Sequence, residues 1–249
     1  MPPIVLTFAA SDPTGGAGLQ ADLLTLAALG CHPLSVVTGL TVQDTRGVES
    51  LEAVASALVT RQASVLLAES KVAAFKAGVL ASPDNVRAVA AIVGQHKYVP
   101  LVLDPVLASG RGDALASDAV RAALVEALIP LTTVLTPNTL EAEQLGGAQR
   151  LLEAGARYVL VTGTHDDTSE VINRLYDRRG LVREDRWKRL PGSYHGSGCT
   201  LASALAALLA RGRAVPDAVR EAQDYTWNAL AAGFKSGAGQ MLPDRFFGR

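Results

Sequence analysis

The chain has 249 residues, 49% of them hydrophobic, which is enough to bury a sizeable core. Its 23 basic and 24 acidic residues nearly cancel, so the composition argues against a nucleic-acid partner or an acidic membrane and favours a small-molecule ligand. Two cysteines cannot build a disulfide framework, no apolar run approaches the roughly 20 residues that span a bilayer, and the first residues carry no leader pattern. We therefore expect a cytoplasmic protein with reduced cysteines.

Short apolar runs alternate with helical patterns along most of the chain. Strand-like runs cover residues 4–9, 34–41, 76–80, 98–103, 133–136 and 158–162. Helical spacing covers residues 19–29, 53–67, 83–95, 118–129, 201–210 and 216–233. This alternation predicts an α/β fold of three layers, with a mostly parallel sheet between helices. Residues 171–176 and 181–187 predict a small antiparallel hairpin at one edge.

The pattern indicates one domain over residues 1–249. No repeat, low-complexity tract or linker interrupts it, and residues 236–249 have the Gly and Pro content of a loose tail. In sheets of this kind, active sites lie at the carboxyl ends of the strands. The polar and glycine-rich segments that follow the strands are therefore the candidate site.

Glycines flank Ser197 directly before the apolar helix at 201–210. Gly196 and Gly198 have no Cβ atom, so a bulky anion can approach the backbone, and the first amides of a helix have no partner within it. This arrangement predicts a site for phosphate or for a developing oxyanion. Cys199 falls in the first helical turn, where a thiol loses its proton more easily. A tight turn onto a core helix would explain the same glycines equally well.

A second glycine-rich loop, residues 11–18, follows the first strand and precedes a helix. Rossmann and Walker loops share that layout, but this loop has neither the Gly-x-Gly-x-x-Gly spacing nor a Gly-Lys-Ser/Thr ending. Asp12 and Asp22 are also explained as a helix cap and a solvated helix residue. The loop alone therefore does not identify a ligand.

Two acidic residues follow separate strands. Asp104 and Glu141 emerge at the same edge of the predicted sheet, where two oxygen ligands could hold Mg²⁺ directly or through water. Taken singly, each is as well explained as a cap or a surface carboxylate. His165 and His195 lie near the same edge, but without a second ligand at metal spacing the sequence favours neither a catalytic nor a metal role for them.

Five segments together carry a family resemblance. They are Ser11–Asp22, Val42–Gly47, Asp104–Val106, Thr136–Glu141 and His195–Thr200. In these segments the chain resembles the hydroxymethylpyrimidine and phosphomethylpyrimidine kinases of thiamine biosynthesis, in the ribokinase-like superfamily, and the likeness covers nearly the whole length. The resemblance implies a ribokinase-like fold, ATP and Mg²⁺ as cofactors, and a homodimer. It also implies transfer of the ATP γ-phosphoryl group to the hydroxymethyl group of the pyrimidine, and then to the resulting monophosphate.

The resemblance also assigns residues. It places the pyrimidine against Asp12, Gly16, Ala17, Gly18, Gln43 and Val79. The planar Gln43 carboxamide can donate to and accept from the ring. Mg²⁺ and the nucleotide fall near Asp104, Asn138, Glu141, Thr162 and Gly198. Gly196, Ser197 and Gly198 become the anion hole, and Cys199 becomes a base or a group that orients the hydroxyl.

The cationic groups depart from the family pattern. The family commonly has a lysine in the loop after the strand-end acid and another at the place of Thr162, and this chain has neither. Arg111 is the candidate replacement for one charge, and the segment between Glu141 and Tyr158 is shorter than usual. These changes bear on ATP affinity and on the second phosphorylation more than on the fold.

Three alternatives stay open. A pyridoxal kinase acts on a flat heteroaromatic hydroxymethyl compound of similar shape, whereas Gln43 and Cys199 argue against a sugar kinase. A pyrimidine-binding protein without turnover would explain the missing lysines, but not the retained Asp104, Glu141 and Cys199. A nicotinamide-dependent oxidoreductase is disfavoured because the dinucleotide fingerprint is absent.

Overall fold

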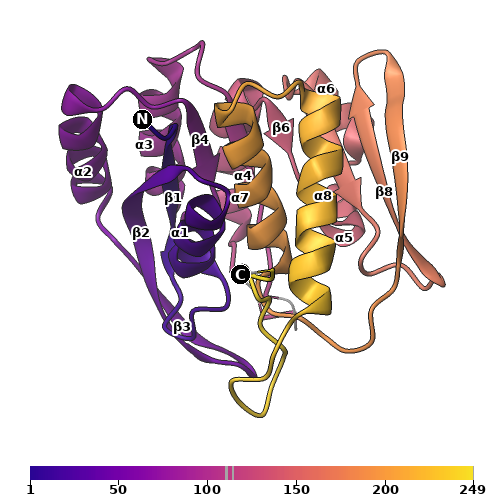
Figure 1. Ribbon diagram of the computed structural model, residues 1–249. Helices are drawn as coiled ribbons and strands as arrows, with labels where there is room; N and C mark the ends of the chain where they lie inside the picture. Colours follow the sequence, from indigo (N-terminus) through magenta and orange to yellow (C-terminus); the bar gives the residue numbers. More distant parts are fainter. Residues whose placement is uncertain (110–111, 114, 249) are drawn as a thin grey trace.

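The structure, a computed structural model, describes residues 1–109, 112–113 and 115–248 (Figure 1). In this described part, nine strands form one mixed sheet in the order β3-β2-β1-β4-β5-β6-β7-β8-β9. The strands are β1 (Ile4–Ser11), β2 (His32–Asp44), β3 (Gly47–Ala53), β4 (Ala74–Ala77), β5 (Leu101–Leu103), β6 (Val134–Leu135), β7 (Tyr158–Thr162), β8 (Glu170–Asp177) and β9 (Gly180–Lys188).

The centre of the sheet is parallel from β2 to β7, and both edges are antiparallel. The β4 and β5 strands are buried along their full length, as expected for parallel strands covered on both faces. The β8–β9 hairpin confirms the antiparallel edge that the sequence predicts. The sequence does not predict β3, because its residues are half-buried or exposed and include no continuous apolar run.

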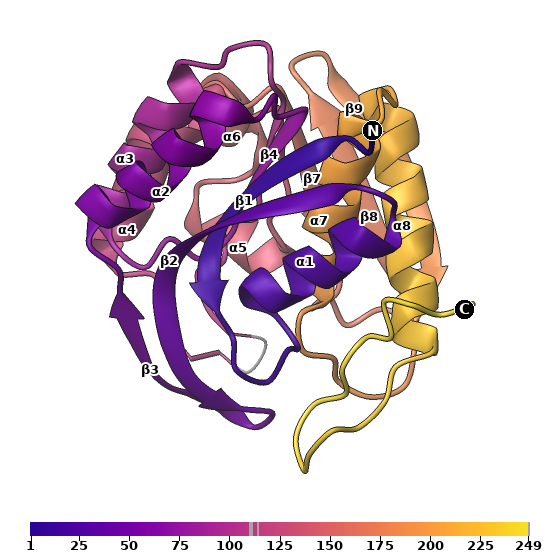
Figure 2. The ribbon, with the colours of Figure 1, turned by 60° about the vertical axis from the view of Figure 1, so that its left-hand side comes forward.

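Helices cover both faces of the sheet (Figure 2). They are α1 (Gly18–Ala28), α2 (Ser56–Glu69), α3 (Pro83–Gly94), α4 (Asp118–Ala123), α5 (Thr139–Gln144), α6 (Ala148–Glu153), α7 (Ser197–Ala210) and α8 (Val215–Ala231). One face carries α1, α7 and α8, and the other carries α2, α3, α4 and α6. The predicted three-layer α/β/α arrangement is confirmed. Among the described helices, none has both the length and the apolar character needed to cross a membrane.

Helix starts follow the sequence signals. Ser82 and Ser117 each accept a hydrogen bond from the backbone N–H three residues on, at 3.1 and 3.3 Å, and so cap α3 and α4. The helix predicted over 118–129 is α-helical only to residue 123. It continues as a π turn (Leu124–Leu128) and a 3₁₀ turn (Ile129–Leu131), because Pro130 has no N–H to donate to a regular helix.

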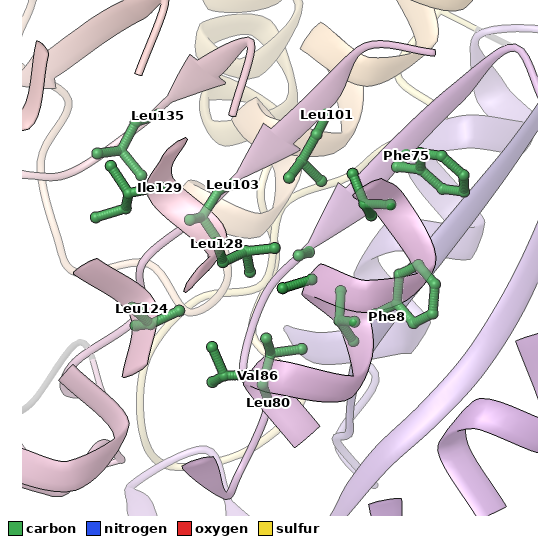
Figure 3. Packing of buried hydrophobic residues seen from close by; sticks show 14 of the residues in the cluster. Phe8, Phe75, Leu80, Val86, Leu101, Leu103, Leu124, Leu128, Ile129 and Leu135 are labelled. Atoms are coloured by element: carbon green, nitrogen blue, oxygen red, sulfur yellow. The ribbon is translucent and has the colours of Figure 1, made fainter. Parts of the chain in front are cut away.

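Two apolar cores hold the layers together. Figure 3 shows the first, in which Phe8 and Phe75 of the sheet pack with Val86 of α3 and Leu128 after α4. The second lies under α7, where residues 200–208 are all buried. Alanine is frequent in this helix, and its small side chain lets α7 approach β1, β4 and β5 closely. The buried helix fixes its own first turn at the carboxyl ends of these strands.

The C-terminal segment is ordered. In Figure 1 it is the yellow loop that returns beneath α8. Leu242 is buried, the N–H of Asp244 donates to α8 at 2.9 Å, and the hydroxyl of Tyr225 donates to the carbonyl of Arg245 at 2.7 Å. The expected loose tail over 236–249 is therefore wrong for the described residues 236–248. Leucine and aromatic side chains anchor the segment despite its Gly and Pro content.

Candidate active site

A cavity of about 450 Å³ opens at the carboxyl ends of the parallel strands, beside the first turn of α7. All but one of the predicted site residues line it: Asp12, Ala17, Gly18, Gln43, Val79, Asp104, Asn138, Glu141, Thr162, Gly196, Ser197, Gly198 and Cys199. The exception is Gly16, which lies behind the cavity wall, against His195 and Leu242. The residues predicted to bind pyrimidine, phosphate and metal thus share one cavity of a size typical for small-molecule sites.

Two loops form one side of the cavity: the substrate loop, residues 12–18, and the anion-hole turn, residues 195–199. The Asp12 carboxylate shapes the first, because Oδ1 accepts from the N–H of Thr14 at 2.8 Å and Oδ2 from that of Ala17 at 2.7 Å. Nε2 of His195 lies 2.8 Å from Oδ2 and ties the two loops together. Burial acts to raise the pKa of Asp12, but these hydrogen bonds lower it overall. Asp12 is therefore an anion that organises the loop.

The two loops also touch through their backbones. A Cβ atom on Gly196 would lie 1.8 Å from the carbonyl oxygen of Gly16, and one on Gly16 would lie 2.4 Å from Cδ2 of His195. Gly196 has a φ of 82°, in the left-handed region that favours glycine. Close approach of the loops therefore requires both glycines. The tight-turn interpretation is correct for Gly196, and the anion site there stays a prediction.

The anion-hole turn leads directly into α7. Gly196 is the N-cap and has no side chain with which to cap the helix. Ser197, Gly198 and Cys199 line the cavity in the first turn, at the positive end of the helix dipole. A Cβ atom on Gly198 would lie 3.5 Å from Oδ2 of Asp104, so the turn and the acidic group are neighbours. This geometry fits the predicted anion site.

Cys199 has the predicted position but not the predicted ionisation. Burial raises the pKa of its thiol to about 12, Lys76 opposes the rise, and Asp104 and Asp22 add to it. The thiol is therefore neutral in the unliganded site, and the expectation that the helix N-terminus favours a thiolate is wrong here. A neutral thiol can still exchange a weak hydrogen bond with a substrate hydroxyl.

Asp104 and Glu141 are both buried at the cavity wall and affect each other's charge. Burial raises the pKa of Asp104 to about 6 and that of Glu141 to about 8, and the Asp104 charge contributes to the second rise. Oδ2 of Asp104 is buried and makes no hydrogen bond to any described residue. An unpartnered carboxylate oxygen beside a second carboxylate fits a hard cation such as Mg²⁺. Within the described ranges no three His, Cys, Asp or Glu side chains form a metal cluster, so such an ion would need further oxygens from its ligand.

Asn138 and Glu141 form a capping box at the start of α5. Oδ1 of Asn138 accepts from the N–H of Glu141 at 2.9 Å, and Oε2 of Glu141 accepts from the N–H of Asn138 at 3.0 Å. Oε1 of Glu141 also accepts from the N–H of Leu107 at 3.1 Å, in the loop after Asp104. The Glu141 carboxylate is thus fixed between two loops that follow neighbouring strands.

Lys76 is a charged residue next to the site that the sequence analysis does not predict. It is fully buried on β4, and its Nζ lies 2.9 Å from Oδ1 of Asp22. Its charge acts on both Asp104 and Cys199. Gly78 leaves the space for it, because a Cβ atom there would lie 2.6 Å from Nζ. The sequence signal that could have revealed Lys76 is a lysine inside an apolar strand. Asp22 is the buried ion-pair partner of this lysine, so its interpretation as a solvated helix residue is wrong.

Gln43 and Val79 line the cavity from β2 and from the turn after β4. Nε2 of Gln43 donates to the hydroxyl oxygen of Thr41 at 2.9 Å, and that hydroxyl donates to the carbonyl of Ser11 at 2.9 Å. This chain of hydrogen bonds fixes the carboxamide beside the end of β1. Gln43 is therefore in place to read a polar edge of a ligand held by the substrate loop.

Another part of the cavity lies between β7, β8, β9 and α8. Thr162 ends β7, and the N–H of Gly163 donates to Oδ1 of Asn173 at 3.1 Å. Asn173 and Trp187 both donate to Oε1 of Gln223, at 2.8 and 2.9 Å. This connected polar network holds an aromatic ring at the cavity wall, which suits stacking against a flat base.

The cationic side chains around the cavity are few. Among the described residues, Lys188 and Arg189 are the lysine and arginine that line it. Arg189 holds the loop after β7, because it donates to the carbonyls of Thr164 and Thr168, each at 2.8 Å. Lys188 is exposed at the rim. Arg111, the predicted replacement for a family lysine, lies outside the described residues.

Residues 12–244 match the family described as phosphomethylpyrimidine kinase. The chain belongs to this family. The hydroxymethylpyrimidine/phosphomethylpyrimidine kinase of Streptomyces coelicolor is 39% identical, over 96% of this chain and 92% of the relative. A solved phosphomethylpyrimidine kinase of Clostridium difficile has a TM-score of 0.80 at 31% identity, covering 92% of this chain and 99% of that one. A solved ADP complex of Bacillus subtilis pyridoxal kinase has a TM-score of 0.89 at 26% identity, covering 98% of each chain.

Membership of the phosphomethylpyrimidine kinase family makes the chain a phosphotransferase. It also confirms the family and the ribokinase-like fold that the sequence resemblance implies. The two solved kinases match 98% and 92% of this chain. The reading as a nicotinamide-dependent oxidoreductase has no support from these comparisons.

Proposed function

We propose that this phosphomethylpyrimidine kinase transfers the γ-phosphoryl group of ATP to the hydroxymethyl group of hydroxymethylpyrimidine, and then a second group to the monophosphate, in thiamine biosynthesis. One observation carries the proposal: Gln43, the anion-hole turn and the Asp104–Glu141 pair line a single cavity. Within this one cavity, Gln43 suits a heteroaromatic acceptor, the anion-hole turn suits a phosphoryl group, and the two carboxylates suit a cation. The Streptomyces relative is named for both phosphorylations.

In this proposal the pyrimidine lies between the substrate loop and Val79. The Gln43 carboxamide donates to a ring nitrogen and accepts from the amino group, because both functions lie in one plane. Ala17 and Gly18 offer backbone and a minimal side chain at the wall, so the ring can approach the loop closely. The hydroxymethyl group then points toward Cys199.

The anion-hole turn stabilises the group in transfer. Phosphoryl transfer has a loose transition state whose charge lies on the transferred oxygens, so positioning and charge stabilisation dominate catalysis. The first amides of α7 donate to these oxygens from Ser197, Gly198 and Cys199. The neutral Cys199 thiol orients the acceptor hydroxyl, and a loose transition state makes little demand on a strong base.

Asp104 and Glu141 are the residues that would hold Mg²⁺, directly or through water. The bound ion supplies neutralisation of charge on the phosphate oxygens. In its absence the raised pKa values keep part of each carboxyl protonated near neutral pH. The capping box holds the Glu141 carboxylate at the start of α5.

Pyridoxal is a second candidate substrate. The observation that favours it is the TM-score of 0.89 with the pyridoxal kinase of Bacillus subtilis, although that protein is only 26% identical. The test is coupled ADP release with Mg²⁺ and ATP, offering hydroxymethylpyrimidine, its monophosphate, pyridoxal and ribose in parallel. Turnover of the first two supports the proposal. Turnover of pyridoxal alone moves the function to vitamin B6 salvage, and pyrimidine binding without ADP release supports a non-catalytic protein.

We also propose a homodimer, which the family resemblance supports. The uninterrupted sequence pattern supports a single domain over residues 1–249, and the cysteine content supports a cytoplasmic location. A homodimer predicts twice the chain mass of 25.9 kDa in light scattering at micromolar concentration. A monomer mass across the working concentration range would reject the dimer without bearing on the chemistry.

A further inference from the structure

Arg245 is a buried cation behind the active site. The residue is 4% exposed, and no carboxylate of the described residues forms an ion pair with its guanidinium. Burying a charge without a counter-ion is unfavourable unless the N–H groups of the charged side chain donate hydrogen bonds to other groups. The acceptors of these hydrogen bonds therefore indicate the role of Arg245.

The guanidinium links the two loops of the site. Nη2 donates to the carbonyl of Gly16 at 2.5 Å, and Nη1 donates more weakly to that of Gly15 at 3.4 Å. Nε donates to the hydroxyl oxygen of Thr200 at 3.2 Å, and this hydroxyl donates to the carbonyl of Gly196 at 2.8 Å. Arg245 thus reaches the substrate loop directly and the anion-hole turn through one hydroxyl.

This linkage is centred where the loops touch. Gly196 packs against the carbonyl oxygen of Gly16, and both carbonyl groups receive hydrogen bonds from the same network. A planar guanidinium holds its acceptors in a fixed geometry, which a single ammonium group does not. The separation of the two loops is therefore set by a rigid bridge as well as by contact.

The segment that carries Arg245 also reaches the hairpin that carries Gln43. The N–H of Gln240 donates to the carbonyl of Thr45 at 2.9 Å, in the β2–β3 turn. The N–H of His195 donates to the carbonyl of Met241 at 2.9 Å. Residues 234–247, here called the C-terminal clasp, therefore connect all three chain segments on the acceptor side of the cavity.

We propose that Arg245 is a positioning residue for phosphoryl transfer, and that the C-terminal clasp sets the separation between the substrate loop and the anion-hole turn. The inference rests on the proposed kinase function. Arg245 does not line the cavity, so it acts through the loops and not on the substrate. A displacement of the acceptor from the anion hole by about 1 Å can slow transfer by roughly a hundredfold.

The test is steady-state kinetics of Arg245→Met in the full chain, with hydroxymethylpyrimidine and ATP as substrates. Methionine fills much of the same space but donates no hydrogen bond. We expect kcat to fall by roughly tenfold or more, while the dissociation constant of ADP, measured by calorimetry, changes by less than about twofold. Arg213→Met, at an exposed arginine on the surface, is the matched control and should leave kcat unchanged.

Thr200→Val and Thr200→Ser keep the test decisive if Arg245→Met does not fold. Valine is close in shape to threonine but removes the hydroxyl between Arg245 and Gly196, whereas serine retains it. Thr200→Val should therefore lose several-fold more kcat than Thr200→Ser. Equal activity of the two Thr200 variants would overturn the inference.

A folded Arg245→Met enzyme with wild-type kcat would also overturn it, even if its melting temperature were lower, because the arginine would then be structural only. Failure of the proposed function gives a different result. If the wild type phosphorylates pyridoxal and not the pyrimidine, the variants are measured on pyridoxal, where the same loops and anion-hole turn are in use. The positioning role and the identity of the acceptor are thus tested separately.

Discussion

Nζ of Lys76 lies 2.9 Å from Oδ1 of Asp22, and both side chains are fully buried beneath the active site. Asp22 also accepts hydrogen bonds from the hydroxyl groups of Thr7 at 2.6 Å and Ser203 at 2.7 Å. The pair therefore joins α1, β1, β4 and α7 at one point. Burial acts to lower the pKa of Lys76, but the Asp22 charge raises it overall, so the lysine stays charged.

Lys76→Met should strongly destabilise the fold. The substitution leaves the Asp22 carboxylate buried without its counter-ion, and breaking one partner of a buried pair costs about 3–5 kcal/mol. The measurement is the free energy of unfolding in urea. The double variant Lys76→Met/Asp22→Asn should recover part of the loss, since no unpaired charge then stays buried. A single variant within about 1 kcal/mol of the wild type would contradict the buried pair as described.

Cys199 should resist alkylation in the native protein. With a pKa of about 12, less than about one part in a thousand of the thiol is ionised at pH 8, and the thiolate is the reactive form. We expect iodoacetamide at pH 8 to modify Cys199 at least about a hundredfold more slowly than in the urea-denatured chain. Mass spectrometry of peptides separates it from Cys31, whose pKa burial also raises. Equal rates in the native and denatured chains would show an ionised thiol and restore the helix-dipole expectation.

The raised pKa of Glu141 predicts a pH dependence of stability. Its pKa is about 8 in the folded protein and near 4.5 in the unfolded chain, so between these values the folded state binds more protons. Stability therefore falls as pH rises through this window, by at most about 1.4 kcal/mol per pH unit for one proton. Unfolding in urea at pH 6, 7 and 8 without Mg²⁺ measures the slope. This contribution should be absent in Glu141→Gln. If the free energy of unfolding changed with pH by the same slope in both proteins, the raised pKa of Glu141 would be rejected.

Magnesium should stabilise the protein more at higher pH. Protons and the cation compete for Asp104 and Glu141, and the carboxylates are freer of protons at pH 8 than at pH 6. A ligand that binds only the folded state raises its stability with concentration. We expect the melting-temperature shift in millimolar Mg²⁺ to grow from pH 6 to pH 8 in the wild type and to be lost in Glu141→Gln. The same shift in both proteins would place the cation elsewhere.

Much of the fold follows from local patterns. The apolar run at 158–162 becomes β7 without a change of boundary, and Ser82 with Pro83 starts α3 as expected. These features depend on residues close in sequence, which a linear pattern records. The strand-end part of the candidate site is predicted for the same reason, because the loops that carry Asp12, Asp104 and Asn138 directly follow the parallel strands β1, β5 and β6.

The missed features depend on residues far apart in the chain. Lys76 and Asp22 become partners only when β4 and α1 pack together, and Arg245 meets Gly16 only through the fold of the C-terminal clasp. The raised pKa of the Cys199 thiol is also a tertiary effect, since burial raises it and the Asp104 and Asp22 carboxylates add to the rise. Local sequence patterns predict neither how deeply a side chain is buried nor which charged groups tertiary packing places beside it.

Gly196→Ala tests whether the contact between the two site loops matters for catalysis, and Gly212→Ala is its control. The two glycines have nearly the same positive φ, 82° and 81°, so the left-handed backbone alone should cost alanine about 1–2 kcal/mol of stability at either position. A Cβ atom at 212 meets no atom within 4 Å, whereas at 196 it would lie 1.8 Å from the carbonyl oxygen of Gly16.

The clash at 196 involves backbone, so the loops must move apart. We expect Gly196→Ala to lower kcat by roughly a hundredfold, while Gly212→Ala keeps kcat and KM within about twofold of the wild type. Coupled ADP release measures both, and urea unfolding should show a loss of stability in both variants that is larger in Gly196→Ala, where the clash adds to the backbone strain. If Gly196→Ala were as active as Gly212→Ala, the loops would tolerate a wider separation. The rigid-bridge role of Arg245 would then lose its physical basis as well.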